Sequence, residues 1–172
     1  MLVWHDEGMP DGAMDAEAGI VIRDYRSADL EAIFRLDQIC FAAEFRFDRE
    51  SMQSFAETRQ AVALVAETGV GELAGFVIVH IERASAARFG YVVTLDVAPS
   101  FRRMGVAGAL MDEASRRIGV AGANWIELHV HVGNAAAIRF YESRGYVRVG
   151  VQRGFYGGKL DAYVYRIELP RS

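Results

Sequence analysis

The chain has 172 residues, a length that suits one domain with a hydrophobic core of its own. Its composition, 52% apolar and 24% charged residues, excludes a disordered chain and a coiled-coil rod. A chain of formal net charge −4 lacks the basic field of a dedicated nucleic-acid binder, and its single cysteine, Cys40, excludes a fold held by internal disulfides.

The first 18 residues do not fit a secretory signal, which needs a basic start and an apolar run of roughly 7–15 residues. They carry five acidic residues instead: Asp6, Glu7, Asp11, Asp15 and Glu17. No uncharged apolar stretch approaches the roughly 20 residues of a membrane-spanning helix. We therefore expect a cytoplasmic protein with no membrane and no nucleic-acid partner.

The first half of the chain predicts a mixture of strands and helices. Residues 1–19 have little apolar periodicity, which indicates an irregular N-terminal extension before one domain over residues 20–172. Runs of apolar residues, helix caps and turn residues then predict these elements in chain order: a strand at Ile20–Tyr25, a helix capped by Ser27 or Asp29, an aromatic loop at Cys40–Phe47, a helix at Arg49–Arg59, and strands at Ala61–Glu67 and Leu73–Ile81.

The second half alternates more regularly. After a connection at Ala84–Arg88, the expected elements are a strand at Phe89–Val97, a helix at Arg103–Ile118, a strand at Trp125–Val132, a helix at Asn134–Arg144, and strands at Tyr146–Gln152 and Leu160–Leu169. Gly157 and Gly158 mark the turn before the last strand. The order β-α-α-β-β-β-α-β-α-β-β predicts one α/β domain with a mixed sheet.

The segment from Leu95 to Gly108 joins a strand to a helix through a turn crowded with arginines and small residues. A helix N-terminus presents unpaired N–H groups and a partial positive charge, and small residues let a phosphate approach them. The turn therefore predicts a site for a pyrophosphate or a similar dianion. The glycines alone are also compatible with a plain strand-to-helix connection.

Two segments resemble the GNAT superfamily of acetyl-CoA-dependent N-acetyltransferases. Its pattern, Arg or Gln, two residues, Gly, one residue, then Gly or Ala, is present as residues 102–107, and its Asn-helix segment as residues 134–146. The resemblance spans residues 20–169 and implies an α/β fold with a mixed, largely antiparallel central sheet flanked by helices. In that fold, two central strands splay apart to admit acetyl-CoA. The segments 128–134 and 154–162 also resemble the protein N-terminal (Nα) acetyltransferases, including those that act on ribosomal proteins.

The resemblance implies direct acetyl transfer within a ternary complex, with acetyl-CoA as co-substrate and no metal. It assigns the binding of acetyl-CoA to the strand end, the turn and the Asn helix: Leu95, Val97, Arg102, Arg103, Met104, Gly105, Val106, Ala107, Gly108, Asn134 and Tyr141. Of these, the N–H of Val97 is the expected oxyanion donor. Cys40 has no evident paired base, so we expect a buried structural cysteine.

Amine acetylation needs a neutral amine and a proton for the leaving thiolate. Tyr141 matches the family's general acid, although a packed aromatic on its helix is the plainer interpretation. Alternation places Glu127, His129 and His131 on one polar face of their strand. His129 is the preferred base, and the alternatives are Glu127 or a reaction without a dedicated base. Tyr91 matches a tyrosine that helps to hold the catalytic water, and His131 is a supporting or structural residue.

The acceptor is expected between the aromatic loop and the terminal hairpin, where Phe41, Glu44 and Tyr156 are the candidate contacts. The loop lacks the Pro that commonly follows the first Phe in the closest Nα-acetyltransferases. A protein or peptide N-terminus is the leading acceptor. A small amine (an amino acid, polyamine or aminoglycoside) and a non-catalytic acyl-CoA-binding module are the alternatives, and the chain is expected to be a monomer or homodimer.

Overall fold

A computed structural model describes residues 19–170, so most of the predicted N-terminal extension lies outside the described residues. The elements, in chain order, are β1 (Val21–Asp24), α1 (Leu30–Cys40), α2 (Arg49–Glu57), β2 (Ala61–Glu67), β3 (Leu73–Ala84), β4 (Ala87–Val97), α3 (Val106–Val120), β5 (Trp125–His131), α4 (Ala135–Ser143), β6 (Val147–Tyr156) and β7 (Leu160–Glu168). Their order is the predicted one. Short 3-10 turns lie at Ser27–Asp29, Ala43–Phe45 and Pro99–Phe101.

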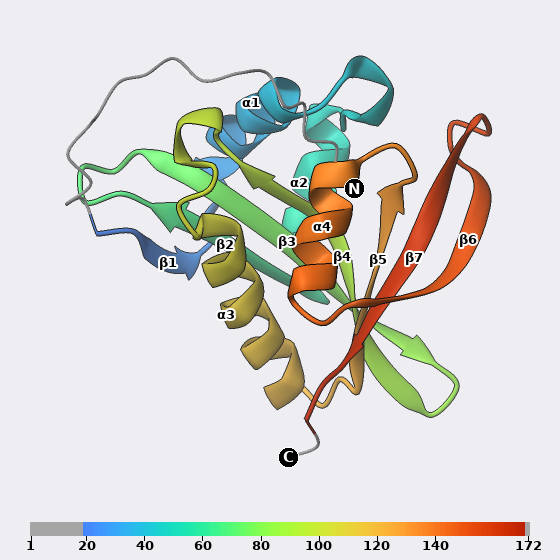
Figure 1. The fold of residues 1–172 in the computed structure, drawn as a ribbon. Helices are drawn as coiled ribbons and strands as arrows, with labels where there is room; N and C mark the ends of the chain where they lie inside the picture. Colours follow the sequence, from blue (N-terminus) through green and yellow to red (C-terminus); the bar gives the residue numbers. More distant parts are fainter. Residues whose placement is uncertain (1–18, 171–172) are drawn as a thin grey trace.

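One seven-stranded sheet forms the centre of the molecule, with the strand order β1-β2-β3-β4-β5-β7-β6 (Figure 1). Every neighbouring pair is antiparallel except β4 and β5, which are parallel. The predicted mixed, largely antiparallel α/β sheet is thus confirmed. The parallel pair is connected through α3, as a parallel crossover requires.

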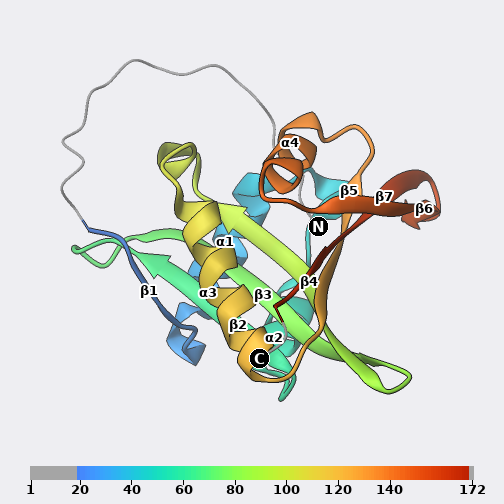
Figure 2. The same ribbon diagram turned by 60° about the horizontal axis from the view of Figure 1, so that its bottom comes forward.

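The two faces of the sheet carry two hydrophobic clusters. On one face α3 and α4 pack against the sheet through residues such as Leu110, Ile118 and Tyr141, and on the other α1 and α2 pack through Ile33 and Met52 (Figure 2). All five side chains are at most 1% exposed. Burial along β5 alternates, with the even-numbered residues buried, which confirms the polar face predicted for this strand.

Several element boundaries differ from the prediction by one or more residues, and three of these differences have a clear cause in the local backbone. The expected connection Ala84–Arg88 is a tight hairpin in which β3 and β4 remain paired as far as Ala84 and Ala87. Helix α3 begins at Val106 rather than Arg103, because Arg103 and Gly105 have the left-handed φ values of 61° and 79°. Strand β6 runs past Gln152 to Tyr156 through an irregular segment.

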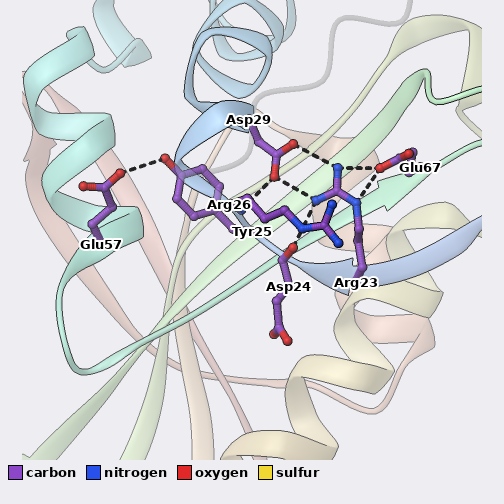
Figure 3. Close-up of polar contacts among 7 residues, drawn as sticks. All are labelled: Arg23, Asp24, Tyr25, Arg26, Asp29, Glu57 and Glu67. Carbon is purple, nitrogen blue, oxygen red and sulfur yellow. Dashed lines mark hydrogen bonds and ion pairs between the residues drawn. The ribbon is translucent and has the colours of Figure 1, made fainter.

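An ionic cluster ties β1 to the start of α1 and to β2 (Figure 3). The guanidinium of Arg23 donates to both carboxylate oxygens of Asp29, at 2.8 and 2.9 Å, and also contacts Glu67. Asp29 in turn accepts a hydrogen bond from the backbone N–H of Arg26 at 2.7 Å, which closes the 3-10 turn before α1. Asp29 stands at the N-cap of α1, one of the two predicted positions, but its side chain makes no capping hydrogen bond to that helix. The contact with Arg23 keeps the pKa of Asp29 below its ordinary value.

Within residues 19–170, none of the helices combines the length and the apolar character needed to span a membrane.

Candidate active site

The parallel strands β4 and β5 pair over only three residue pairs, from Phe89 with Trp125 to Tyr91 with Glu127. Beyond this point β4 continues to Val97 beside β3, β5 continues to His131 beside β7, and the two ribbons diverge (Figures 1 and 2). Beyond Tyr91 and Glu127, the two strands therefore form no further residue pairs with each other within residues 19–170.

The end of β4 directs one backbone donor toward this gap. The N–H of Ala98 donates to Ala74 on β3 at 2.9 Å. Successive N–H groups of an extended strand point to opposite sides, so the N–H of Val97 points away from β3 and toward β5. The carbonyl of Val97 accepts hydrogen bonds from Arg102 Nε at 3.2 Å and from the thiol of Cys40 at 3.4 Å. The strand end is thus held rigidly while its N–H faces the gap.

The turn after β4 has the open backbone that an anion site requires. Gly105 precedes α3 with φ of 79°, and no atom lies within 4 Å of the position that a Cβ would occupy there. Arg103 and Met104 beside it are exposed, whereas Val106 and Ala107 are buried in the first turn of α3. The first N–H groups of this helix lack intrahelical partners, as at any helix start.

Two arginines flank the turn in ways that differ from each other. Arg102 turns inward, toward Val97 and Cys40. Arg144, which follows α4, lies over α3: a Cβ on Gly108 would meet its Nη1 at 2.9 Å, and its guanidinium pairs with Asp112. Sequence spacing does not reveal this contact, because Arg144 lies 36 residues after Gly108 in the chain.

Tyr141 and Asn134 come from α4. The ring of Tyr141 is 0% exposed, and its hydroxyl has no hydrogen-bond partner among the described residues. Burial raises its pKa well above the ordinary value, so the hydroxyl keeps its proton. Asn134 caps α4 as predicted: its side-chain oxygen accepts the N–H of Ala137 at 3.2 Å.

His129 lies at the centre of a polar and aromatic group on the exposed side of β5. Its Nδ1 lies 3.1 Å from the Tyr91 hydroxyl and its Nε2 lies 2.7 Å from Oε1 of Gln152. The ring of Phe155 stacks on the imidazole with 4.0 Å between centroids and 3° between planes. Partial burial lowers the pKa of His129, so the ring is neutral near pH 7 and able to accept a proton.

Glu127, the alternative base, has a different environment. Its carboxylate lies 2.8 Å from Nη2 of Arg166, and that guanidinium also packs over the ring of Trp125. The Glu127 carboxylate is thus engaged by a cation on the neighbouring strand, and no hydrogen bond or ion pair joins it to Tyr91 or to the aromatic group around His129 in the described part of the chain. The structure therefore brings Tyr91 to His129 and sets Glu127 apart with Arg166.

The two segments expected to bind the acceptor meet beside this group. Phe45 from the α1–α2 segment and Tyr156 from the β6–β7 hairpin pack edge to face at 5.0 Å, and His131 contacts both rings. Phe41 and Phe45 are buried, and Glu44 is exposed. The Tyr156 hydroxyl is buried and has no partner within residues 19–170.

A buried acidic pair beneath α1 was not predicted. Asp37 and Asp96 are both at most 1% exposed, and each has one carboxylate oxygen without a partner among the described residues. Burial raises the pKa of Asp37 to about 6, and burial together with the charge of Asp37 raises the pKa of Asp96 well above its ordinary value. Cys40 lies in the same region and is buried, which raises the pKa of its thiol to about 12 and supports the structural role expected of it.

No cluster of three or more His, Cys, Asp or Glu side chains with the arrangement of a metal site occurs in the part of the chain that the structure describes.

Comparison with known proteins places these features in a family context. The model of the acetyltransferase (GNAT) family matches residues 30–146. An N-alpha-acetyltransferase from Sulfurisphaera tokodaii is 28% identical over 155 residues, which cover 83% of this chain and 89% of that protein. The structure of Arabidopsis thaliana NAA60 in complex with a bisubstrate analogue is 26% identical and superposes with a TM-score of 0.76 over 90% of this chain and 100% of that one. The ribosomal-protein-S18-alanine N-acetyltransferase from Escherichia coli, 22% identical, shares the fold with a TM-score of 0.77 over 90% of this chain and 96% of its own.

Proposed function

Because the chain belongs to the acetyltransferase (GNAT) family and is an acetyl-CoA-dependent N-acetyltransferase, we propose that its acceptor is the α-amino group of a protein or peptide N-terminus. The observation that carries this proposal is the meeting of the α1–α2 segment with the β6–β7 hairpin at Phe45 and Tyr156, beside His129. The buried Tyr156 hydroxyl, which has no partner among the described residues, suits a peptide backbone, which offers a carbonyl or an N–H to a polar group. The distant relationship to N-alpha-acetyltransferases supports the same acceptor.

Acetyl-CoA would lie in the gap between β4 and β5. Its pyrophosphate would accept hydrogen bonds from the backbone N–H groups of Gly105–Gly108. Arg103 and Arg144 would supply positive charge at the edge of this phosphate site. The pantetheine arm would pair with the free edge of β4 at Leu95 and Val97 and contact Asn134, in the manner of an added strand.

The chemistry then needs three groups. His129, through the hydroxyl of Tyr91 or a water held by it, takes the proton of the ammonium and leaves a neutral amine. The amine nitrogen attacks the thioester carbonyl, and the N–H of Val97 stabilises the developing oxyanion. As the C–N bond forms and the C–S bond breaks, the Tyr141 hydroxyl gives its proton to the sulfur. The nitrogen then loses its second proton, which restores the Tyr141 hydroxyl and leaves a neutral amide.

The acceptor is identified by thiol release from acetyl-CoA across a panel. Short peptides of varied first residue are compared with the same peptides blocked at the α-amine, and with free amino acids, polyamines and aminoglycosides. We expect release with the unblocked peptides only, and mass spectrometry should find the acetyl group on the first residue. Turnover confined to the small amines would overturn the peptide assignment while leaving the acetyl-CoA site intact.

A further inference from the structure

The end of β6 contains a bulge that brings two side chains onto the same histidine. Gln152 pairs with Ala162 and Tyr156 pairs with Leu160, so residues 153–155 of β6 lie opposite Asp161 alone. The extra length turns at Gly154, whose φ is 61° and whose N–H donates to the Asp161 carboxylate at 2.8 Å. In a regular strand, residues three apart point to opposite faces. The bulge instead lets Gln152 and Phe155 both contact His129.

The contacts of His129 favour one of the two neutral tautomers of its ring. The side-chain carbonyl of Gln152 can only accept, so the nitrogen 2.7 Å from it, Nε2, carries the hydrogen. In a neutral ring Nδ1 then has the lone pair, and the hydroxyl of Tyr91, 3.1 Å away, donates to it. Phe155 stacks on the ring and fixes its plane. The opposite tautomer would place a hydrogen on Nδ1, where the proton from the acceptor has to arrive.

We propose that Gln152 is a positioning residue, which holds His129 in the Nε2–H tautomer so that Nδ1 is open to the proton delivered through Tyr91. The inference rests on the proposed role of His129 as base. Gln152 acts through His129 and belongs to β6, outside the segments whose sequence suggested catalysis. The charged or titratable groups around the ring are Tyr91 from β4 and Glu127 from β5, with Arg166 of β7 bound to Glu127.

The test compares three variants with the natural chain. Gln152→Leu removes the acceptor, Gln152→Glu keeps one, and Val151→Thr changes the neighbouring exposed residue of β6 without touching His129. The first readout is ¹⁵N NMR of the histidine rings at neutral pH, with His129 assigned by loss of its signals in His129→Ala. We expect the Nε2–H tautomer in the natural chain, Val151→Thr and Gln152→Glu, and a mixture of both tautomers in Gln152→Leu.

The second readout is kinetic. The loss of one hydrogen bond to the base should lower kcat of Gln152→Leu by about five- to tenfold, with KM for acetyl-CoA unchanged. In Gln152→Glu the added negative charge should move the acidic limb of the pH profile to higher pH. An unaltered Nε2–H tautomer in Gln152→Leu would overturn the proposal. Because the NMR readout needs no acceptor, a wrong acceptor assignment leaves this test valid.

Discussion

Glu127 and Arg166 face each other across β5 and β7, with 2.8 Å between the carboxylate and guanidinium atoms. Two residues along β5, His129 is surrounded by a hydroxyl, an amide and an aromatic ring, and it forms no ion pair with any residue between 19 and 170. The first arrangement holds a charge in place, whereas the second leaves a neutral base able to take up a proton. Glu127 and His129 lie on the same face of β5, so the difference between them comes from the side chains that contact them and not from their position.

The first prediction concerns the base. His129→Ala should lower kcat at pH 7 by roughly 10²–10⁴-fold and remove the acidic limb of the pH profile, because that limb reports protonation of the imidazole. Since burial lowers the pKa of His129, this limb should lie below pH 6.5. Glu127→Gln should keep the limb. The measurement is the pH dependence of kcat for both variants. If the acidic limb disappears in Glu127→Gln and remains in His129→Ala, then Glu127 and not His129 is the base.

The second prediction concerns the general acid. Tyr141→Phe keeps the packing of a fully buried ring and removes only the hydroxyl, so kcat should fall by roughly 10²–10⁴-fold while the Kd for acetyl-CoA changes little. Tyr146→Phe is the matched control, since its ring lies 5.1 Å from that of Tyr141 and is also buried. Steady-state kinetics and calorimetric titration with acetyl-CoA give the two quantities. Equal losses of kcat in both variants would mean that the Tyr141 hydroxyl contributes to packing and does not donate the proton.

The third prediction concerns the turn before α3. Gly105→Ala introduces a Cβ at φ of 79°, which costs about 1–2 kcal/mol in the left-handed region and should distort the N–H groups that bind the pyrophosphate. The KM for acetyl-CoA should rise, with less effect on kcat at saturation. Gly119→Ala, near the other end of α3 and with open space around its Cβ, is the control and should leave that KM unchanged. A KM unaffected by Gly105→Ala would place the pyrophosphate elsewhere.

The fourth prediction concerns stability and pH. The pKa of Asp37 is about 6 in the folded protein and 3.8 ordinarily, so its stabilising contribution is complete below about pH 4 and is lost as the pH rises through 6. The difference corresponds to about 3 kcal/mol. Asp37→Asn should remove this loss and raise the free energy of unfolding at pH 7.5, as measured by urea denaturation from pH 4.5 to 8.

The control for that series is Asp48→Asn, because an exposed Asn caps α2 about as well as Asp does. It should leave the pH dependence unchanged. An Asp37→Asn protein no more stable than the natural chain at pH 7.5 would show that the hydrogen bonds from the Phe47 N–H and Gln38 Nε2 offset the cost of burying the charged carboxylate.

The fold was largely predictable because its elements depend on local signals. Alternating or continuous apolar runs gave all the strands, and Asp29, Gly145 and Asn134 mark helix ends. The errors arise where the backbone is irregular. Arg103 takes a left-handed φ that no arginine prefers, so α3 starts later than expected. The bulge of β6 depends on the Asp161 side chain of the next strand, which local pattern cannot reveal.

The site was predictable only where the family motif or strand alternation applies. The turn at Gly105, the cap at Asn134 and the polar face of β5 follow from such patterns. Gln152, Arg144 and the pair Asp37 and Asp96 do not, because each reaches its neighbours through tertiary contacts between distant segments. A single sequence contains no signal for such contacts. Their discovery required the register of β6 against β7 and the packing of α1 on β4.

The short pairing of β4 with β5 divides the sheet into two blocks, β1 to β4 and β5 to β7, that share three residue pairs along one seam. A molecule that binds across this seam would hold the two blocks together in addition to taking part in the reaction. By mass action, its concentration would set how often the seam opens. Amide exchange along β5 would then depend on how much acetyl-CoA is present, so the stability of this enzyme would itself report the supply of its co-substrate.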